Sequence, residues 1–478
     1  SPDNIPLKPK YYLPVSLKGY KKGDFSMVMG YPGSTDRYMT SFEVKELMDI
    51  EHPNRIKIRG MKQKLMMEDM VASDAVRIMY ASKYSRSSNY WKYSIGQTEG
   101  LKNLNVIARK KSLETAFTSW LSTNAEIKNK YGDALHLIEK GVKARKDLVS
   151  SQQYLFECMY QGMETVQFGL RFRKLFNELS KETPDSEVIQ KLTDELKLQI
   201  DNFYKNYHLG TDKKISRAML QLMLSDMPGQ YQPTVVKEIN TRYKGSTDKY
   251  LDRYYKKSIL PYREKVEAFL SDPSAKVLEK DPGFRASMSF LSVYFAIRDQ
   301  ETDFDAKVEE GRRLWIEGLR QMKTDRKFYP DANSTLRLTY GTTGDYNPRD
   351  AVHYSYFTTL QGVMEKEDPG NPEFIVSDKL KQLYNDKDYG RYGENGIMHV
   401  CFTTNNDITG GNSGSPVLNA NGELMGIAFD GNWEAMSGDI IFEPELQKCI
   451  CVDIRYVLFV IDKYAGDTRL IDEMTLVE

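Results

Sequence analysis

The sequence has little net charge, few cysteines and no long apolar run. Lys plus Arg (67) equals Asp plus Glu (67), so no net field attracts nucleic acid or an anionic membrane. No run of about 18 uncharged apolar residues occurs, so no membrane span is expected. The nearest stretch, 454–465, contains Arg455, Asp462 and Lys463 and indicates an amphipathic C-terminal helix.

The four cysteines lack both the spacing of a zinc site and the density of a disulfide scaffold; they are Cys158, Cys401, Cys449 and Cys451. Cys449 and Cys451 are two residues apart, which in a strand directs both side chains to one face. We expect buried free thiols. No glycine-rich phosphate loop, metal-ligand cluster or haem motif is present, so we predict no cofactor and no metal.

The order of patterns along the 478 residues is β, then a long helical block, then β again. Residues 1–40 contain a short apolar run, FSMVMG, that ends at a Tyr-Pro-Gly turn. Residues 41–329 have helical periodicity, and one apolar helical face combines Ile189, Leu192, Leu196, Ile200 and Phe203. Thr183 before Pro184 predicts where that helix starts.

Residues 330–478 return to strand patterns. The stretch STLRLTYG alternates apolar and polar residues, and GIMHVCFTT does so less regularly. The segments SPVLN and ELMGIAF flank a turn at Asn421-Gly422, which is the strongest hairpin signal in the chain. The whole order suggests one β domain interrupted by a helical insertion.

The hexapeptide Gly411-Asn412-Ser413-Gly414-Ser415-Pro416 carries the clearest chemistry. A serine nucleophile needs a tight turn that projects its hydroxyl, with nearby backbone N–H groups aimed at the developing oxyanion. Glycines on both sides allow that turn. We predict Ser413 as the nucleophile, with the N–H groups of Gly411 and Ser413 as the oxyanion hole. The alternative is a plain Gly/Ser loop between strands.

The segment TGGNSGSPVLNANGELMGIAFDGNW resembles the active-site block of the dipeptidyl-peptidase 7 and 11 family of bacterial serine peptidases. The resemblance extends to GDFSMVMGYPGSTDRY, SSNYWK and PDANSTLRLTYG, and so spans nearly the whole chain. It implies a mixed β and α fold, a chymotrypsin-like double β-barrel with a large helical domain inserted between the barrels. Residues 1–40 would end the first barrel, incomplete here; 41–329 would form the helical domain and 330–478 the second barrel with the C-terminal helix.

The resemblance also implies an exopeptidase that releases dipeptides from the free N-terminus of peptides. In the family, the residue 18 positions after the serine governs the side chain accepted before the cut; arginine suits acidic residues and glycine suits apolar ones. Gly431 stands there, without a cation to pair with Asp or Glu, so we expect an apolar preference. Asn89 matches the asparagine that holds the substrate ammonium group, and Asp430 is a weaker candidate for it.

A serine peptidase also needs a histidine base and an acid that orients it. None of the five histidines, His52, His136, His208, His353 and His399, lies in the sequence context that the family shows, and we interpret all as structural or surface residues. Asp24 is interpreted as a turn residue. We therefore expect the family's base and acid upstream of residue 1, and this chain alone to be nearly inactive, because losing the base costs on the order of a million-fold.

Two other functions fit parts of the pattern. A glutamyl-type endopeptidase would share the serine motif, but Gly431 and the large helical block argue against it. A non-catalytic peptide-binding protein on a degenerate peptidase scaffold would explain the missing histidine but not the intact serine block. The resemblance implies a periplasmic or cell-surface protein, with peptides as partners, and it is compatible with a homodimer.

Overall fold

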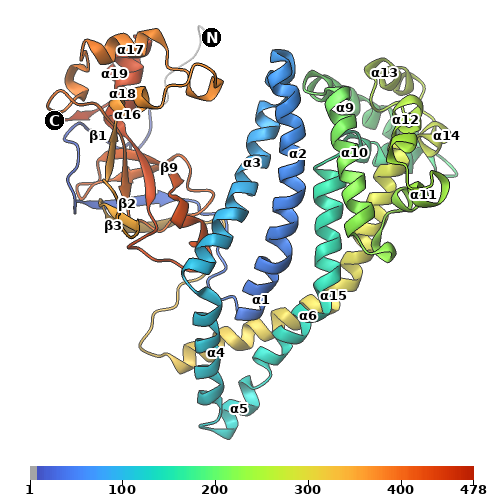
Figure 1. Ribbon diagram of the computed structural model, residues 1–478, viewed down its shortest axis with the longest axis horizontal. Helices are drawn as coiled ribbons and strands as arrows, with labels where there is room; N and C mark the ends of the chain where they lie inside the picture. Colours follow the sequence, from blue (N-terminus) through green and yellow to red (C-terminus); the bar gives the residue numbers. More distant parts are fainter. Residues whose placement is uncertain (1–7) are drawn as a thin grey trace. The chain divides into compact units, whose positions relative to one another are not determined.

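The computed structural model describes residues 8–478, which form two compact units. Of the described residues, unit 1 combines 8–39, 99–104 and 327–478, and unit 2 combines 40–98 and 105–326. Figure 1 shows the strands gathered in the first unit and the long helices in the second. Among the described helices, none is both long and apolar enough to cross a bilayer.

Unit 1 is built on a sheet of nine strands, with a separate two-stranded hairpin made by β4 and β5. Seven strands follow the order β3-β2-β8-β9-β10-β7-β6, and β1 pairs with both β9 and β11. The strands are β1 (Val15–Ser16), β2 (Phe25–Gly30), β3 (Arg337–Thr342), β4 (Tyr346–Arg349), β5 (Val352–Tyr354), β6 (Phe357–Thr359), β7 (His399–Thr404), β8 (Ser415–Leu418), β9 (Leu424–Gly431), β10 (Cys449–Asp453) and β11 (Leu476–Val477).

The sheet curls until its β3 and β7 strands meet. Thr343, just after β3, bridges Thr404 at the end of β7, and the Gly344 N–H donates to the Thr403 carbonyl at 3.1 Å. The path from β3 through β2, β8, β9 and β10 to β7 therefore closes on itself as a barrel. Its interior holds Val28, Phe402, Val417, Met425 and Ala428 with their neighbours, all buried, which supplies the apolar core that closure requires.

Strand β2 lies in the same sheet as the strands after residue 330. It pairs antiparallel with β3 from Phe25–Thr342 to Gly30–Arg337, and with β8 at Met27–Leu418 and Val28–Val417. Its alternating burial, with Val28 fully buried, explains this placement between two partners. Strand β2 therefore belongs to the barrel of the strands after residue 330, not to a separate first barrel as expected, because both of its partners, β3 and β8, come from that region. The double-barrel arrangement as a whole stays a prediction.

The expected hairpin is confirmed, because β8 and β9 pair antiparallel from Ser415–Ala428 to Leu418–Leu424. Cys449 and Cys451 are also buried free thiols on one face of β10, with their Sγ atoms 3.5 Å apart. Asp24 is a turn residue, whose carboxylate accepts a hydrogen bond from the Lys21 N–H at 2.6 Å.

Four α-helices of unit 1 lie between its strands in the chain. They are α16 (Leu360–Glu365) and α17 (Asp378–Asn385), between β6 and β7, and α18 (Ile454–Phe459) and α19 (Thr468–Asp472), between β10 and β11. They share a second core with β1, built on buried Leu360, Ile454, Leu458 and Phe459. The expected C-terminal helix over 454–465 is present, but its second half, Val460–Ala465, is wound as a π-helix and ends before Gly466, whose φ is +75°.

Unit 2 is helical. Its α-helices are α1 (Ser41–Glu46), α2 (His52–Ala72), α3 (Asp74–Asn103), α4 (Val106–Leu121), α5 (Ala125–Tyr131), α6 (Ala134–Tyr154), α7 (Glu164–Leu170), α8 (Arg173–Leu179), α9 (Ser186–Lys205), α10 (Leu209–Asp226), α11 (Thr234–Arg242), α12 (Thr247–Lys257), α13 (Arg263–Ser271), α14 (Ala275–Lys280) and α15 (Pro282–Met322). The last residues of α3, from Glu99 on, belong to unit 1. Figure 1 shows α2 and α3 side by side, and the Trp91 indole of α3 donates to the Ile56 carbonyl of α2 at 3.1 Å.

The predicted apolar face of α9 is confirmed, since Leu196 and Ile200 are buried in the core around Phe168. The predicted start of this helix was placed two residues early. Asp185 is the residue that caps it, because its carboxylate accepts from the N–H groups of Glu187 (2.9 Å) and Val188 (3.2 Å).

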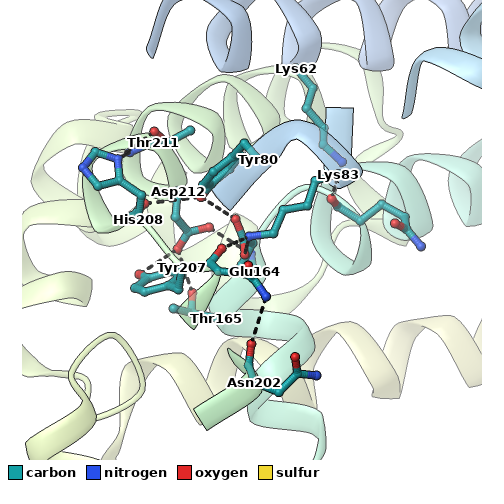
Figure 2. A network of polar contacts seen from close by, with 12 residues as sticks. Lys62, Tyr80, Lys83, Glu164, Thr165, Asn202, Tyr207, His208, Thr211 and Asp212 are labelled. Atoms are coloured by element: carbon teal, nitrogen blue, oxygen red, sulfur yellow. Dashed lines mark hydrogen bonds and ion pairs between the residues drawn. The ribbon is translucent and has the colours of Figure 1, made fainter. Parts of the chain in front are cut away.

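A buried polar network ties several helices of unit 2 together (Figure 2). The Asp212 carboxylate accepts from the Glu164 N–H at 2.9 Å and from the Tyr207 hydroxyl at 3.2 Å. Burial, followed by the charge of Glu164, raises the pKa of Asp212 to about 7. Nearby, the Lys62 Nζ donates to the Gln161 carbonyl at 2.6 Å, and burial lowers its pKa to about 8. The network therefore satisfies polar groups that would otherwise be costly to bury.

Candidate active site

Ser413 stands on a tight turn between the loop after β7 and strand β8. Its side chain is exposed, and its hydroxyl donates to the Phe429 carbonyl of β9 at 3.3 Å. The flanking glycines have positive φ angles, +107° at Gly411 and +85° at Gly414, which any other residue adopts only with strain. A side chain at Gly411 would also lie 2.4 Å from the Tyr31 carbonyl oxygen. The turn therefore needs both glycines, as the sequence predicts.

Two amides of this turn have no acceptor in the described part of the chain. The Asn412, Gly414 and Ser415 N–H groups donate to Thr409, Ala428 and Asn412 carbonyls at 3.1, 2.7 and 2.9 Å. The Gly411 and Ser413 N–H groups make no such bond with any described residue. These are the two amides that the sequence nominates for an oxyanion hole, and the geometry leaves them available for an incoming anion.

The serine turn is held by the segment after β2. The Gly33 N–H donates to the Gly410 carbonyl at 2.6 Å. Gly30 has no room for a side chain, since a Cβ there would lie 2.2 Å from Ser415 Oγ and 2.5 Å from Asn412 Nδ2. The Tyr-Pro-Gly turn that the sequence places at the end of a strand thus also braces the loop of the predicted nucleophile.

A second support comes from Asn406, which sequence reasoning missed. Its side chain is buried; Oδ1 accepts from the Ser26 hydroxyl at 2.6 Å, and Nδ2 donates to the Thr339 carbonyl at 2.9 Å. It therefore joins the loop that leads to Ser413 to strands β2 and β3. Asn406 is the middle residue of the polar Asn-Asn-Asp run before the serine block, but nothing local distinguishes it from a surface loop residue.

The end of β9 brings Asp430 and Gly431 next to the serine turn. Between Ile450 and Cys451 the register with β10 shifts, so Phe429 has no partner residue in β10. Such a bulge re-aims the strand, and here the bulged residue is the one whose carbonyl accepts from Ser413. Asp430 is exposed, and Gly431 is half-buried.

Of the predicted site residues, unit 1 thus brings together Ser413, Gly411, Asp430 and Gly431. Asn89 belongs to unit 2, where its side chain is exposed on α3, so the structure does not unite it with Ser413 inside one unit. Near the end of β9, Trp433 also donates from its indole to Glu99 at 3.1 Å, a contact within unit 1 that sequence reasoning did not anticipate.

The histidines of unit 1 have structural partners. His353 is exposed, and its Nδ1 lies 2.9 Å from Asn347 Oδ1. The His399 ring stacks on Phe357 with centroids 4.5 Å apart, and burial, followed by the Arg455 charge, lowers its pKa. In the described residues the Ser413 hydroxyl is bonded to a carbonyl and to no histidine.

Comparison with known proteins establishes the family of the chain. Residues 1–476 match the family model of Peptidase S46. The chain belongs to this family. It is 44% identical, over 483 residues, to dipeptidyl-peptidase 7 of Porphyromonas gingivalis, and 42% identical to dipeptidyl-peptidase 7 of Porphyromonas endodontalis. It is also 38% identical to the Asp/Glu-specific dipeptidyl-peptidase of Porphyromonas gingivalis.

Each of these matches covers the whole chain, but the chain spans only 66%, 58% and 66% of these three relatives. Among solved structures, the chain is similar to Porphyromonas endodontalis DPP11 in complex with the dipeptide Arg-Glu. That similarity has a TM-score of 0.90 at 36% identity, covering 99% of this chain and 67% of the other. The resemblance drawn from the serine block is therefore confirmed at the level of the family.

Proposed function

We propose that this chain carries the nucleophile of a serine peptidase that releases dipeptides from the free N-terminus of peptides. It also carries the residue that selects the side chain before the cut, Gly431. The observation that carries the proposal is the exposed Ser413 hydroxyl between two glycines of positive φ, beside two amides without an acceptor among the described residues. Family membership and the names of the relatives, which are dipeptidyl-peptidases, support the exopeptidase assignment.

The proposed reaction is acyl transfer through a covalent intermediate. Ser413 Oγ attacks the carbonyl carbon after the second residue, and the N–H groups of Gly411 and Ser413 donate to the oxyanion that forms. The serine proton passes to a base, which returns it to the leaving amine as the peptide C–N bond breaks. A water molecule then attacks the acyl-enzyme ester, so the dipeptide leaves with a free carboxylate and Ser413 Oγ regains its proton. The described histidines are not bonded to Ser413, so we retain the prediction that residues 1–478 alone turn over very slowly.

The proposed substrate has an apolar residue before the cut. Gly431 lies two residues after Phe429 in β9 and presents no side chain, and so no cation to pair with an acidic residue. The proposal assigns the substrate ammonium group to Asn89, with Asp430 as a second acceptor. Relatives named dipeptidyl-peptidase 7 and relatives named Asp/Glu-specific both match this chain, so the preference needs a direct test.

The test uses dipeptide aryl-amides with leucine or aspartate as second residue, each with a free and a blocked amino end. The assay is run on this chain and on the chain with the upstream segment of its longer relatives restored. In the restored protein the proposal expects cleavage of the free leucine substrate above all others, lost in Ser413→Ala, and labelling of Ser413 by an active-site phosphonate, whereas this chain alone should turn over very slowly. Equal cleavage of blocked substrates would favour an endopeptidase, and neither labelling nor cleavage would favour a non-catalytic scaffold. Turnover by this chain at the rates of an intact peptidase would contradict the predicted inactivity.

By the same resemblance we propose a periplasmic or cell-surface location and, as a further expectation, a homodimer. Fractionation of the source cells tests the location. Light scattering on the purified protein tests the assembly state, and a monomeric mass at all concentrations would contradict the homodimer.

A further inference from the structure

The space next to Gly431 is not empty. A Cβ placed on Gly431 would lie 3.0 Å from the Cβ of Ala435, whereas carbon atoms in contact prefer about 3.5–4.0 Å. The other atom near that position, the Lys448 carbonyl oxygen, is at 3.9 Å, an ordinary contact. The methyl group of Ala435 therefore stands where the side chain of residue 431 would begin.

Ala435 is held in this position by Asn432. Ala435 lies in the short 3₁₀ turn Trp433–Ser437, and its N–H donates to the Asn432 side-chain oxygen at 3.1 Å and to the Asn432 carbonyl at 3.0 Å. The Asn432 side chain is buried and also donates to the Leu446 carbonyl and accepts from the Lys448 N–H, both at 2.8 Å. The turn is thus pinned to the start of β10, so Ala435 cannot move aside cheaply.

The Ala435 methyl group lies next to strand β9, which also contacts the nucleophile. Gly431 follows Phe429 in β9 by two residues, and Phe429 accepts the hydrogen bond of the Ser413 hydroxyl. We propose that Ala435 is a second specificity-determining residue, which sets together with Gly431 how large an apolar side chain fits before the cut. This inference rests on the proposed function of Ser413 and Gly431.

Two consequences separate this pair from Gly431 acting alone. Enlarging residue 435 should narrow the space for the substrate side chain before the cut, even though position 431 still has no side chain. Adding a methyl at position 431 should be tolerated only when the methyl at position 435 is removed, because the two would otherwise be 3.0 Å apart. The effects of the two positions are therefore expected to be non-additive, as for residues in contact.

The first experiment measures binding, so that it does not depend on turnover. The chain and its Ala435→Val variant are titrated calorimetrically with dipeptides whose second residue is alanine, leucine or phenylalanine. One methyl or methylene group in an apolar pocket discriminates by roughly 10- to 200-fold. We expect Ala435→Val to weaken phenylalanine binding at least tenfold relative to alanine, and the matched exposed variant Ala420→Val to leave all three affinities unchanged.

The second experiment is a double-mutant cycle of Gly431→Ala, Ala435→Gly and the combined protein, read by the same titrations and by melting temperature. We expect Gly431→Ala to lower the dipeptide affinities and the melting temperature, and the added Ala435→Gly change to restore both. Unchanged dipeptide affinities in Ala435→Val, or purely additive effects in the cycle, would overturn the inference. If the dipeptide affinities shift as expected but Ser413 neither cleaves peptides nor takes a phosphonate, the proposed function fails while the joint role of the two positions in side-chain selection stands.

Discussion

His52 is the residue through which acid should destabilise the helical unit. It is fully buried at the first position of α2, and its Nδ1 lies 2.8 Å from the Thr98 hydroxyl. That hydroxyl donates its one hydrogen to the Ser94 carbonyl at 2.7 Å, so it accepts from Nδ1–H, and Nε2 is the atom that a further proton would occupy. Burial, followed by the charge of Arg55, lowers the pKa of His52 from 6.5 to about 4.

The sign and size of the effect follow from this shift. The folded state holds a neutral imidazole while the unfolded chain binds a proton, so stability is complete above pH 6.5 and falls as the pH drops toward 4. Each pH unit in that window costs about 1.4 kcal/mol, so His52 should cost about 2 kcal/mol at pH 5.

Urea unfolding, followed by the helical circular dichroism signal at pH 7.5 and pH 5, measures this cost. The wild type, His52→Gln and the exposed control His136→Gln are compared, so that contributions of all other titrating groups cancel. Between pH 7.5 and pH 5, the free energy of unfolding of His52→Gln should fall by about 2 kcal/mol less than that of the wild type. His136→Gln should show the same fall as the wild type. The same loss in all three proteins would refute a neutral buried His52.

Two further predictions concern the support of the serine turn. Gly30→Ala forces a Cβ to within 2.2 Å of Ser415 Oγ, so it should lower the stability by about 1–3 kcal/mol and slow phosphonate labelling of Ser413. A Cβ at Gly344 would have no described atom within 4 Å, so the control Gly344→Ala should have neither effect, and equal labelling rates in the two variants would contradict the bracing role of Gly30. Asn406→Ala leaves buried hydrogen-bond partners unsatisfied and should lower the free energy of unfolding in urea by about 2–4 kcal/mol. The exposed control Asn421→Ala should lower it by less than about 0.5 kcal/mol, and similar losses in the two variants would contradict the supporting role of Asn406.

Features that depend on neighbouring residues could be predicted from the sequence. The β8–β9 hairpin follows from its turn residues, and the conformation around Ser413 follows from the glycines on either side. The start of α9 was misplaced because the proline before it gives a start signal as well as Asp185 does, and only the geometry shows which residue caps the amides.

Features that join distant segments could not be predicted in this way. Strand β2 pairs with β3 across about three hundred residues of intervening chain, and its short apolar run would fit a buried strand of any sheet. Asn406 and Ala435 escaped notice for a related reason: an asparagine and an alanine in loops have no periodicity or spacing that reveals the partner. Their roles depend on which segments the barrel brings beside them.

The conformation of the serine turn therefore depends on closure of the barrel. The Pro32 carbonyl accepts from the Ser334 N–H at 2.8 Å, and the neighbouring Gly33 N–H donates to the Gly410 carbonyl at 2.6 Å, so the turn after β2 links the segment before β3 to the serine loop. Asn406 makes a second such link to Ser26 and Thr339. Each link joins segments that lie far apart in the sequence and that the paired strands bring together. The Gly411 and Ser413 amides are thus oriented by the closed barrel, and conditions that separate β2 from its partner strands should abolish phosphonate labelling of Ser413 even where the helical unit stays folded.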